Sequence, residues 1–290
     1  MPFFSIIIPT RNEEKRLAYC LPSLLNQSFQ DFEIIVVEDP ETSDKTSEFI
    51  QNLKSDKIKY IFHPKGLIIG AKRDYAVNSV EGKFIYFIDA DMEFPSNTLK
   101  EIHDLIVKDS SKIVFVAEET PGKAWLNKMK NIEKTLAISN LSLSAVRVFE
   151  TDLYRSIGGY NKNLIAAEDG DLSDRAMKTG ANYSVTSTKI KHYETVGVSY
   201  WNHLAKKFKY GISSRDYFSH QKTQGQSSDS TQESTPRSTS SLQTYFFSPI
   251  LWKNPLVAVQ FVTFKFIELS ALALGLIYGK IFSKKVVNTR

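Results

Sequence analysis

Two aspartates end a run of apolar residues in the first third of the chain. Phe84 to Ile88 are all apolar or aromatic, and Asp89 and Asp91 follow directly. Such a run predicts a strand buried on both faces, and side chains two residues apart along a strand point the same way. Two carboxylates about 4 Å apart repel each other by about 4 kcal/mol at an effective dielectric constant of about 20. The pair therefore predicts a site for Mg²⁺ or Mn²⁺, although two turn-forming aspartates would give the same pattern.

Further acidic side chains follow a predicted strand or open a predicted helix. Glu38 and Asp39 follow the predicted strand 32–37, and three acids, Glu168, Asp169 and Asp171, precede a helical segment. In open α/β sheets, ligands bind beyond the carboxyl ends of the strands. We expect these acids to gather at that rim, where a carboxylate of raised pKa can act as a general base. Capping of the helix is the alternative role for the last cluster.

The segments between these acids alternate between short apolar runs and helical periods. Strands are expected at 3–8, 32–37, 58–62, 84–89, 112–117, 142–149 and 184–192, and helices at 12–25, 42–53, 71–80, 99–107, 124–138, 172–179 and 200–210. Strands separated by helices predict a mostly parallel sheet with right-handed crossovers. The expected fold class is therefore α/β, a Rossmann-like sheet flanked by helices.

Composition restricts the classes of function. The chain has 290 residues, 42% of them hydrophobic and 24% charged, which suits one large domain or a domain with an appendage. The single cysteine, Cys20, excludes a disulfide framework and a cysteine zinc site. The net charge of +5 comes without a basic stripe interleaved with aromatic residues, so we expect no nucleic-acid partner. An anionic diphosphate or a membrane surface accounts for the excess equally well.

Five groups of motifs resemble those of the family 2 glycosyltransferases, which have the GT-A fold. They are Ser5-Ile6-Ile7-Ile8-Pro9-Thr10-Arg11-Asn12-Glu13; Val36-Val37-Glu38-Asp39 with Thr42-Ser43-Asp44; Arg73-Asp74; Asp89-Ala90-Asp91, a DxD motif; and Gly158-Gly159-Tyr160 with Glu168-Asp169-Gly170-Asp171-Leu172 and Arg175. No single motif is specific, but their order and spacing are. We therefore expect a GT-A domain over 1–215, a flexible Ser/Thr/Gln-rich linker over 216–244 and a hydrophobic, membrane-associating segment over 245–290.

The resemblance implies an inverting, metal-dependent hexosyltransferase that uses a UDP- or GDP-linked sugar. Asp91, with Asp89, would bind the cation, and Asp169 would be the general base, with Glu168 and Asp171 orienting it and competing for the same role. Residues implied in donor binding are Pro9, Thr10, Arg11, Glu13, Glu38, Asp39, Arg73 and Asp89. Within this set, Arg73 would contact the donor phosphates.

On the acceptor side, the implied residues are Gly158, Gly159, Tyr160, Arg175 and Trp201. Trp201 opens a basic helical segment that could receive an acceptor phosphate, although a solvated basic face is the more ordinary interpretation. His192 could be a further metal ligand, but a lone histidine at a strand end is more often a packed or surface residue.

The apolar stretch 254–279 near the end of the chain is long enough to cross a bilayer. As a helix its 26 residues would measure about 39 Å, against a hydrocarbon core of about 30 Å. Lys265 and Glu268 interrupt it three residues apart and could pair on one face. A crossing from the cytosol, where most nucleotide sugars are found, would put the basic residues of 280–290 outside, against the positive-inside tendency. The polar positions do not gather on one helical face, so the sequence does not indicate a clean amphipathic helix lying on the surface. We expect association with the cytoplasmic face of the cell membrane, with the choice between a re-entrant and a monotopic mode left open and a helix buried against the catalytic domain or a partner subunit as the alternative.

Two other functions compete with glycosyl transfer to a hydroxyl or phosphate on a lipid-linked acceptor or a growing glycan. A nucleotidyltransferase would need a glycine-rich, basic loop after the first strand, and residues 9–13 contain no glycine. A non-catalytic sugar-nucleotide-binding or interaction module on the same fold would leave Asp169 dispensable.

Overall fold

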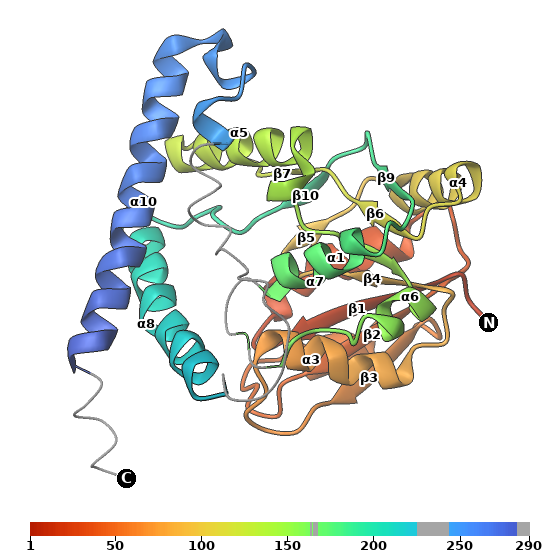
Figure 1. Cartoon of the computed structure of the whole chain (residues 1–290). Coiled ribbons are helices and arrows are strands. Elements are labelled where there is room, and N and C mark those ends of the chain that lie inside the picture. Colours follow the sequence, from red (N-terminus) through yellow and green to blue (C-terminus); the bar gives the residue numbers. More distant parts are fainter. Residues whose placement is uncertain (163, 165–167, 225–243, 283–290) are drawn as a thin grey trace. The chain divides into compact units, whose positions relative to one another are not determined.

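The computed structural model describes residues 1–162, 164, 168–224 and 244–282, and it divides into two compact units (Figure 1). The first unit comprises Met1–Pro121, Ala137–Lys162 and Glu168–Glu194. The second contains Gly122–Leu136 and the chain from Thr195 onward. The acidic residues predicted for the cation, base and donor sites all lie in the first unit.

A seven-stranded sheet in the order β3-β2-β1-β4-β8-β6-β9 runs through the first unit. Its strands are β1 (Phe4–Thr10), β2 (Phe32–Glu38), β3 (Ile58–Phe62), β4 (Phe84–Phe87), β6 (Ile113–Phe115), β8 (Val148–Glu150) and β9 (Tyr183–Val185). Strand β8 is antiparallel to its neighbours β4 and β6, and the other pairs in this sheet are parallel. The predicted mostly parallel α/β sheet is confirmed.

Helices cover both faces of this sheet. They are α1 (Glu14–Leu25), α2 (Thr46–Asn52), α3 (Ile69–Ala76), α4 (Thr98–Asp109), α6 (Thr151–Ser156) and α7 (Glu168–Lys178), with 3₁₀ turns η1 (Val77–Ser79) and η2 (Leu141–Leu143). Ile6 and Ile8 of β1 pack with α1, α2 and α4, whereas Ile7 packs with α3, α6 and α7. Because neighbouring strand residues point to opposite faces, a strand covered on both sides must be apolar throughout.

A second, three-stranded sheet has the order β5-β10-β7. It consists of β5 (Met92–Glu93), β7 (Glu118–Glu119) and β10 (Ile190–His192). Strand β10 is antiparallel to β5 and parallel to β7. This sheet joins the segments that follow β4, β6 and β9, so it brings residues far apart in the sequence to one place.

Two of the predicted strands differ in the structure. The single strand expected over 184–192 is wrong, since β9 and β10 are separate strands of different sheets. Between them Thr186 donates to the Thr188 carbonyl, and Glu101 accepts from the Thr188 amide. Such side-chain bonds compete with a continuous ladder. In the expected strand 142–149, only the last residues join β8, and the first part forms η2.

The described part of the second unit is helical. It contains α8 (Tyr200–Gln224), η3 (Leu251–Lys253), α10 (Pro255–Phe282) and α5 (Trp125–Ser139), of which the residues up to Leu136 belong to this unit. Helix α8 continues into the range predicted as a linker, so residues 216–224 are helical, and residues 225–243 lie outside the described residues. Helix α10 confirms the predicted apolar C-terminal helix. Among the described helices, its stretch Pro255–Gly279 is the one long and apolar enough to cross a membrane.

Candidate active site

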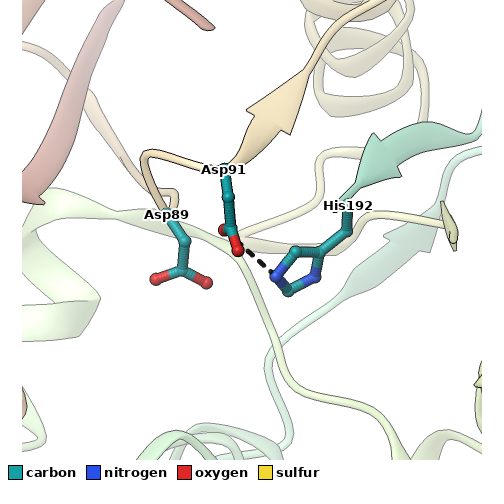
Figure 2. Close-up of side chains that lie close together, drawn as sticks. All are labelled: Asp89, Asp91 and His192. Atoms are coloured by element: carbon teal, nitrogen blue, oxygen red, sulfur yellow. Dashed lines mark ion pairs between the residues drawn. The ribbon is translucent and has the colours of Figure 1, made fainter. Parts of the chain in front are cut away.

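Asp89 and Asp91 lie in the turn between β4 and β5, and His192 faces them from the end of β10 (Figure 2). Each side chain offers one ligand atom, and these atoms all lie within 4.8 Å of one another. The distance from Asp91 Oδ1 to His192 Nε2 is 3.4 Å. The pairing of Met92 with His192 across β5 and β10 brings the histidine here. Two carboxylates and an imidazole are a donor set that fits Mn²⁺ or Mg²⁺.

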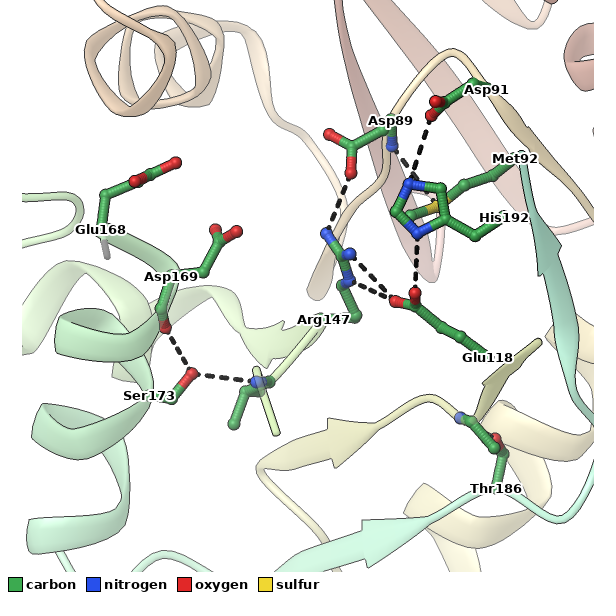
Figure 3. Close-up of polar contacts among 12 residues, drawn as sticks. Asp89, Asp91, Met92, Glu118, Arg147, Glu168, Asp169, Ser173, Thr186 and His192 are labelled. Carbon is green, nitrogen blue, oxygen red and sulfur yellow. Dashed lines mark hydrogen bonds and ion pairs between the residues drawn. The ribbon is translucent and has the colours of Figure 1, made fainter. Parts of the chain in front are cut away.

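Glu118, in β7, holds His192 from the side away from Asp91 (Figure 3). Its Oε2 lies 2.7 Å from His192 Nδ1. A hydrogen bond from Nδ1–H to a carboxylate leaves the Nε2 lone pair for a metal, and metal-binding histidines are commonly oriented in this way. Burial lowers the pKa of His192, but Glu118 and Asp91 outweigh burial and raise that pKa to about 9. A bound cation would oppose this protonation.

Two buried arginines hold Asp89. Arg73 Nη2 lies 2.5 Å from Asp89 Oδ1, and Arg147 Nη1 lies 3.4 Å from Oδ2. Burial by itself raises the pKa of Asp89, yet the two guanidinium groups more than offset it and keep that pKa well below its ordinary value. Arg147 also donates from Nε to Glu118 Oε1 at 3.0 Å. The orientation of the histidine and that of the first aspartate are therefore connected through one side chain.

Arg73 reaches a second acid, Asp169, at the start of α7. Its Nη1 donates to Asp169 Oδ1 at 2.7 Å, and the Tyr160 hydroxyl donates to the same oxygen at 2.8 Å. Neither contact uses Asp169 Oδ2. Ser173 donates to the Asp169 carbonyl at 2.5 Å and accepts from the Val146 amide at 2.9 Å, which ties α7 to the residue before Arg147 (Figure 3). Arg73 is 3% exposed and faces carboxylates, where the resemblance implied donor phosphates.

Glu168 lies beside this group, with Oε1 4.0 Å from Arg73 Nη1. Burial, followed by the charge of Asp169, raises the pKa of Glu168 to about 7. Glu168 and Asp169 are therefore both near the cation site, and Glu168 gains or loses its proton near neutral pH. Both remain candidates for proton transfer on geometric grounds.

Asp171, the third acid of the cluster, has a different partner. Its Oδ2 accepts from Arg175 Nε at 3.0 Å and Nη2 at 2.7 Å. The same guanidinium donates to the carbonyls of Ile157 and Gly159 at 2.6 and 2.7 Å. Gly159 has φ +64°, and a Cβ there would lie 2.4 Å from Asp74 Oδ1. Asp171 and Arg175 thus hold the predicted acceptor-side turn, and Asp171 does not share Asp169's contact with Arg73.

Glu38 and Asp39 end β2 in different surroundings. Glu38 is fully buried, burial raises its pKa, and it accepts from the Thr10 hydroxyl at 3.0 Å. Asp39 accepts from Lys72 Nζ at 2.6 Å, and Arg11 Nη1 lies 3.9 Å away. Burial acts to raise the pKa of Asp39, but the Lys72 hydrogen bond lowers it below its ordinary value. Asp39 is therefore an ionised acceptor beside basic side chains.

The remaining predicted residues have other neighbours. Pro9 lies in β1 opposite Val37. The Glu13 carboxylate pairs with Arg16 at 3.0 Å, and burial raises its pKa. Trp201 is 78% exposed on α8 and belongs to the second unit.

Glu118, Arg147 and Lys72 were missed in the sequence. Arg147 is a charged residue among the apolar residues 146–149. Because charged residues are almost never fully buried unless they are paired, its position in the sequence could have indicated a buried acidic partner. Glu118 follows a strand at the same rim as the predicted acids. Lys72 gave no signal that distinguishes it from any other helix lysine.

Residues 5–165 match the model of Glycosyl transferase family 2. The poly(ribitol-phosphate) beta-N-acetylglucosaminyltransferase TarS of Staphylococcus aureus (strain MW2) is 29% identical over 204 residues, covering 66% of this chain and 35% of TarS. The GalNAc(5)-diNAcBac-PP-undecaprenol beta-1,3-glucosyltransferase of Campylobacter jejuni is 34% identical over 110 residues, covering 35% of this chain and 34% of that protein. The chain thus spans about a third of the length of these two relatives.

Solved structures share the fold. The crystal structure of S. aureus TarS 1-349 has a TM-score of 0.55 at 20% identity, covering 97% of this chain and 91% of that one. The mannosyltransferase PcManGT from Pyrobaculum calidifontis, in complex with GDP-Man and Mn²⁺, has a TM-score of 0.66 at 14% identity, covering 97% and 87%. At these identities the likeness shows the GT-A fold alone. Because the family model matches more than half of its residues, the chain belongs to glycosyl transferase family 2.

Proposed function

We propose that this chain is a metal-dependent, inverting hexosyltransferase that moves a sugar from a UDP- or GDP-linked donor to a hydroxyl or phosphate acceptor. The observation that carries the proposal is the shared guanidinium of Arg73, which lies 2.5 Å from Asp89 and 2.7 Å from Asp169. A cation ligand and a candidate base are thereby held next to each other. The relatives add support, because PcManGT is described with GDP-Man and Mn²⁺, and a TarS structure with UDP-GlcNAc.

Asp89, Asp91 and His192 would hold the cation, which when bound supplies stabilisation of the negative charge that grows on the departing diphosphate. Arg73 and Arg147 keep Asp89 ionised and oriented. Asp39 and Lys72, with residues 9–13 at and after the end of β1, offer hydrogen-bonding groups to the nucleoside end of the donor, and the buried Glu38 supports them by accepting from the Thr10 hydroxyl.

Asp169 is the proposed general base. Arg73 and Tyr160 fix its Oδ1, so that Oδ2 can accept the proton of the attacking hydroxyl. Attack on the anomeric carbon from the face opposite the leaving diphosphate forms one bond as the other breaks, and this inverts the configuration. Glu168, with its pKa near 7, is the second candidate for this role.

We propose a lipid-linked carrier or a growing glycan as the acceptor, and the cytoplasmic face of the membrane as the location. The relatives support this, since one is named as acting on an undecaprenol-linked glycan and one on poly(ribitol-phosphate). The apolar helix α10 supports membrane association.

The test is Asp169→Asn, compared with Glu168→Gln. A panel of nucleotide sugars with Mn²⁺ is first screened for thermal stabilisation of the wild-type chain, and the stabilising donor is then used to assay hydrolysis and transfer. We expect Asp169→Asn to lose transfer and to bind the donor nearly as the wild type does. Unchanged activity would favour the non-catalytic module, and a parallel collapse of donor affinity would make Asp169 a structural residue.

A further inference from the structure

The two charges in the middle of α10 are turned toward other helices of the second unit. Lys265 and Glu268 are the only charged residues in the sequence between Pro255 and Gly279, and they are 7% and 2% exposed. Lys265 Nζ lies 2.6 Å from Glu268 Oε2 and 2.8 Å from Glu133 Oε1 on α5. His203 Nε2 on α8 lies 2.5 Å from Glu268 Oε1. The predicted pairing of Lys265 with Glu268 is confirmed, and it is part of a network that spans three helices.

Helices α8 and α10 lie side by side (Figure 1), and their backbones come into contact at two glycines. A Cβ on Gly211 of α8 would lie 2.1 Å from the Leu272 carbonyl oxygen of α10. A Cβ on Gly275 of α10 would lie 2.0 Å from the Phe208 carbonyl oxygen of α8. Glycine is therefore required on both sides of the crossing, and α8 is held along α10 from His203 to Gly211.

The opposite face of α10 is apolar and open. Its large side chains recur at helical spacing and are between 53% and 78% exposed: Leu256, Val259, Phe266, Leu274, Ile277 and Ile281. A surface helix of a soluble protein shows the reverse arrangement, with charges outward and the apolar stripe buried. An apolar face of this length marks a contact surface.

The outer side of α8 is polar at the level of the buried charges. Lys206 and Lys209 are exposed there, and Lys207 lies 3.6 Å from Glu268. If α10 crossed a bilayer, the network and the glycine contact would draw these lysines into the hydrocarbon, where charged side chains are strongly disfavoured. His203 and Lys207, in the segment expected to receive an acceptor phosphate, contact Glu268 instead.

Basic residues flank the apolar stretch in the sequence. Lys253 precedes it, and Lys280, Lys284 and Lys285 follow in the sequence. Two copies of the face, packed parallel or antiparallel, would bring basic ends together, whereas anionic lipid headgroups would attract both ends.

We infer that α10 lies along the surface of a lipid bilayer, with its outer face at the boundary between headgroups and acyl chains and α8 on the water side. The inference concerns how the chain meets the membrane and goes beyond the proposed transfer reaction. Its test measures binding to lipid vesicles. The result is therefore separate from that of the hydrolysis and transfer assays that test the proposed function.

The first experiment is flotation of the purified full chain with vesicles of phosphatidylglycerol and phosphatidylethanolamine. Phe266→Glu with Leu274→Glu should lower vesicle binding by about a hundredfold, because two large apolar contacts are lost and two charges are gained. Ala205→Glu, on the exposed side of α8, is the matched control and should bind as the wild type does. Circular dichroism checks the fold of each variant. Equal binding of all variants would overturn the inference.

The second experiment measures how deeply α10 enters the bilayer. Single cysteines replace Val259, Phe266 or Ile277, each carries a fluorophore, and its quenching by spin-labelled lipids reports its depth. Cys20 is buried and does not compete for the label. We expect one shallow depth at all three positions. A label at Phe266 much deeper than the other two would show a crossing helix. Absence of vesicle binding together with a concentration-dependent dimer would show that a second copy covers this face. Either result refutes the inference.

Discussion

Glu118→Gln should weaken the cation site without changing a ligand atom. The substitution keeps the size of the side chain and removes its charge. The carboxylate serves two neighbours, His192 Nδ1 at 2.7 Å and Arg147 Nε at 3.0 Å. A glutamine has one acceptor oxygen, so its amide nitrogen would be directed at one of the two donors. Either His192 loses the partner that selects its tautomer, or Arg147, which also contacts Asp89, is displaced.

The magnitude follows from the number of ligands affected. Loss of one hydrogen-bond partner behind a metal ligand typically lowers metal affinity by about 10- to 100-fold. Glu118 supports His192 directly and Asp89 through Arg147, which is two of the three proposed ligands. We therefore expect a loss near the upper end, about 100-fold, or about 2.7 kcal/mol of binding free energy.

The assay is a titration with Mn²⁺ in which free Mn²⁺ is followed by electron paramagnetic resonance. Glu119→Gln is the matched control, because it removes the same charge from the next residue of β7, which points to the other face of that strand. The control should stay within about twofold of wild type, as expected for a charge without these contacts. Equal losses in both variants, or none in Glu118→Gln, would refute the proposed orientation of His192.

Three further predictions concern stability. Arg73→Gln should cost about 3–5 kcal/mol in urea unfolding at pH 7, because Asp89 and Asp169 lose their shared buried cation, and a cost below about 1 kcal/mol would contradict this. The pKa of Glu168 is raised from 4.5 to about 7, so the folded state binds more protons and stability should fall by about 3 kcal/mol as pH rises between these values. Glu168→Gln should remove this slope in urea unfolding. Gly275→Ala, which in an ordinary helix stabilises by about 1 kcal/mol, should instead lower the melting temperature, whereas Ala273→Leu on the exposed side should leave it nearly unchanged.

Features carried by local pattern could be predicted, and those made by distant pairing could not. The run 84–88 indicated a strand buried on both faces, but β4 ends at Phe87, so Asp89 and Asp91 lie in the turn after it and not in the extended chain expected through Asp89. The position of His192 depends on β10 pairing with β5 and β7, which no local pattern reveals. Arg147 reaches the site because β8, which follows it, is inserted antiparallel between β4 and β6, and Glu118 reaches it because β7 pairs with β10.

The family resemblance predicted where Arg73 and Asp171 lie in the fold better than it predicted what their side chains contact. Arg73 stands where the resemblance expects it, yet its side chain is buried among carboxylates. Asp171 lies in the expected acidic cluster, yet it pairs with Arg175 four residues on, as the helical period allows. In both cases the position of the backbone was predictable, but the direction of a long side chain depends on charges from other elements.

The distribution of charge supports the proposed cation site. The carboxylates gathered there are Asp89, Asp91, Glu118, Glu168 and Asp169, and the arginines are Arg73 and Arg147. Each arginine is shared between carboxylates, so the arginines fix directions without balancing the total charge. His192 must be neutral to bind a metal through Nε2, and it then leaves the charge of Asp91 unbalanced. A diphosphate approaching alone would meet an excess of negative charge, whereas a divalent ion at Asp89 and Asp91 would reverse the local sign of the field. In the proposed reaction the buried arginines thus orient the carboxylates, and a bound cation would supply the charge that lets an anionic donor bind beside them.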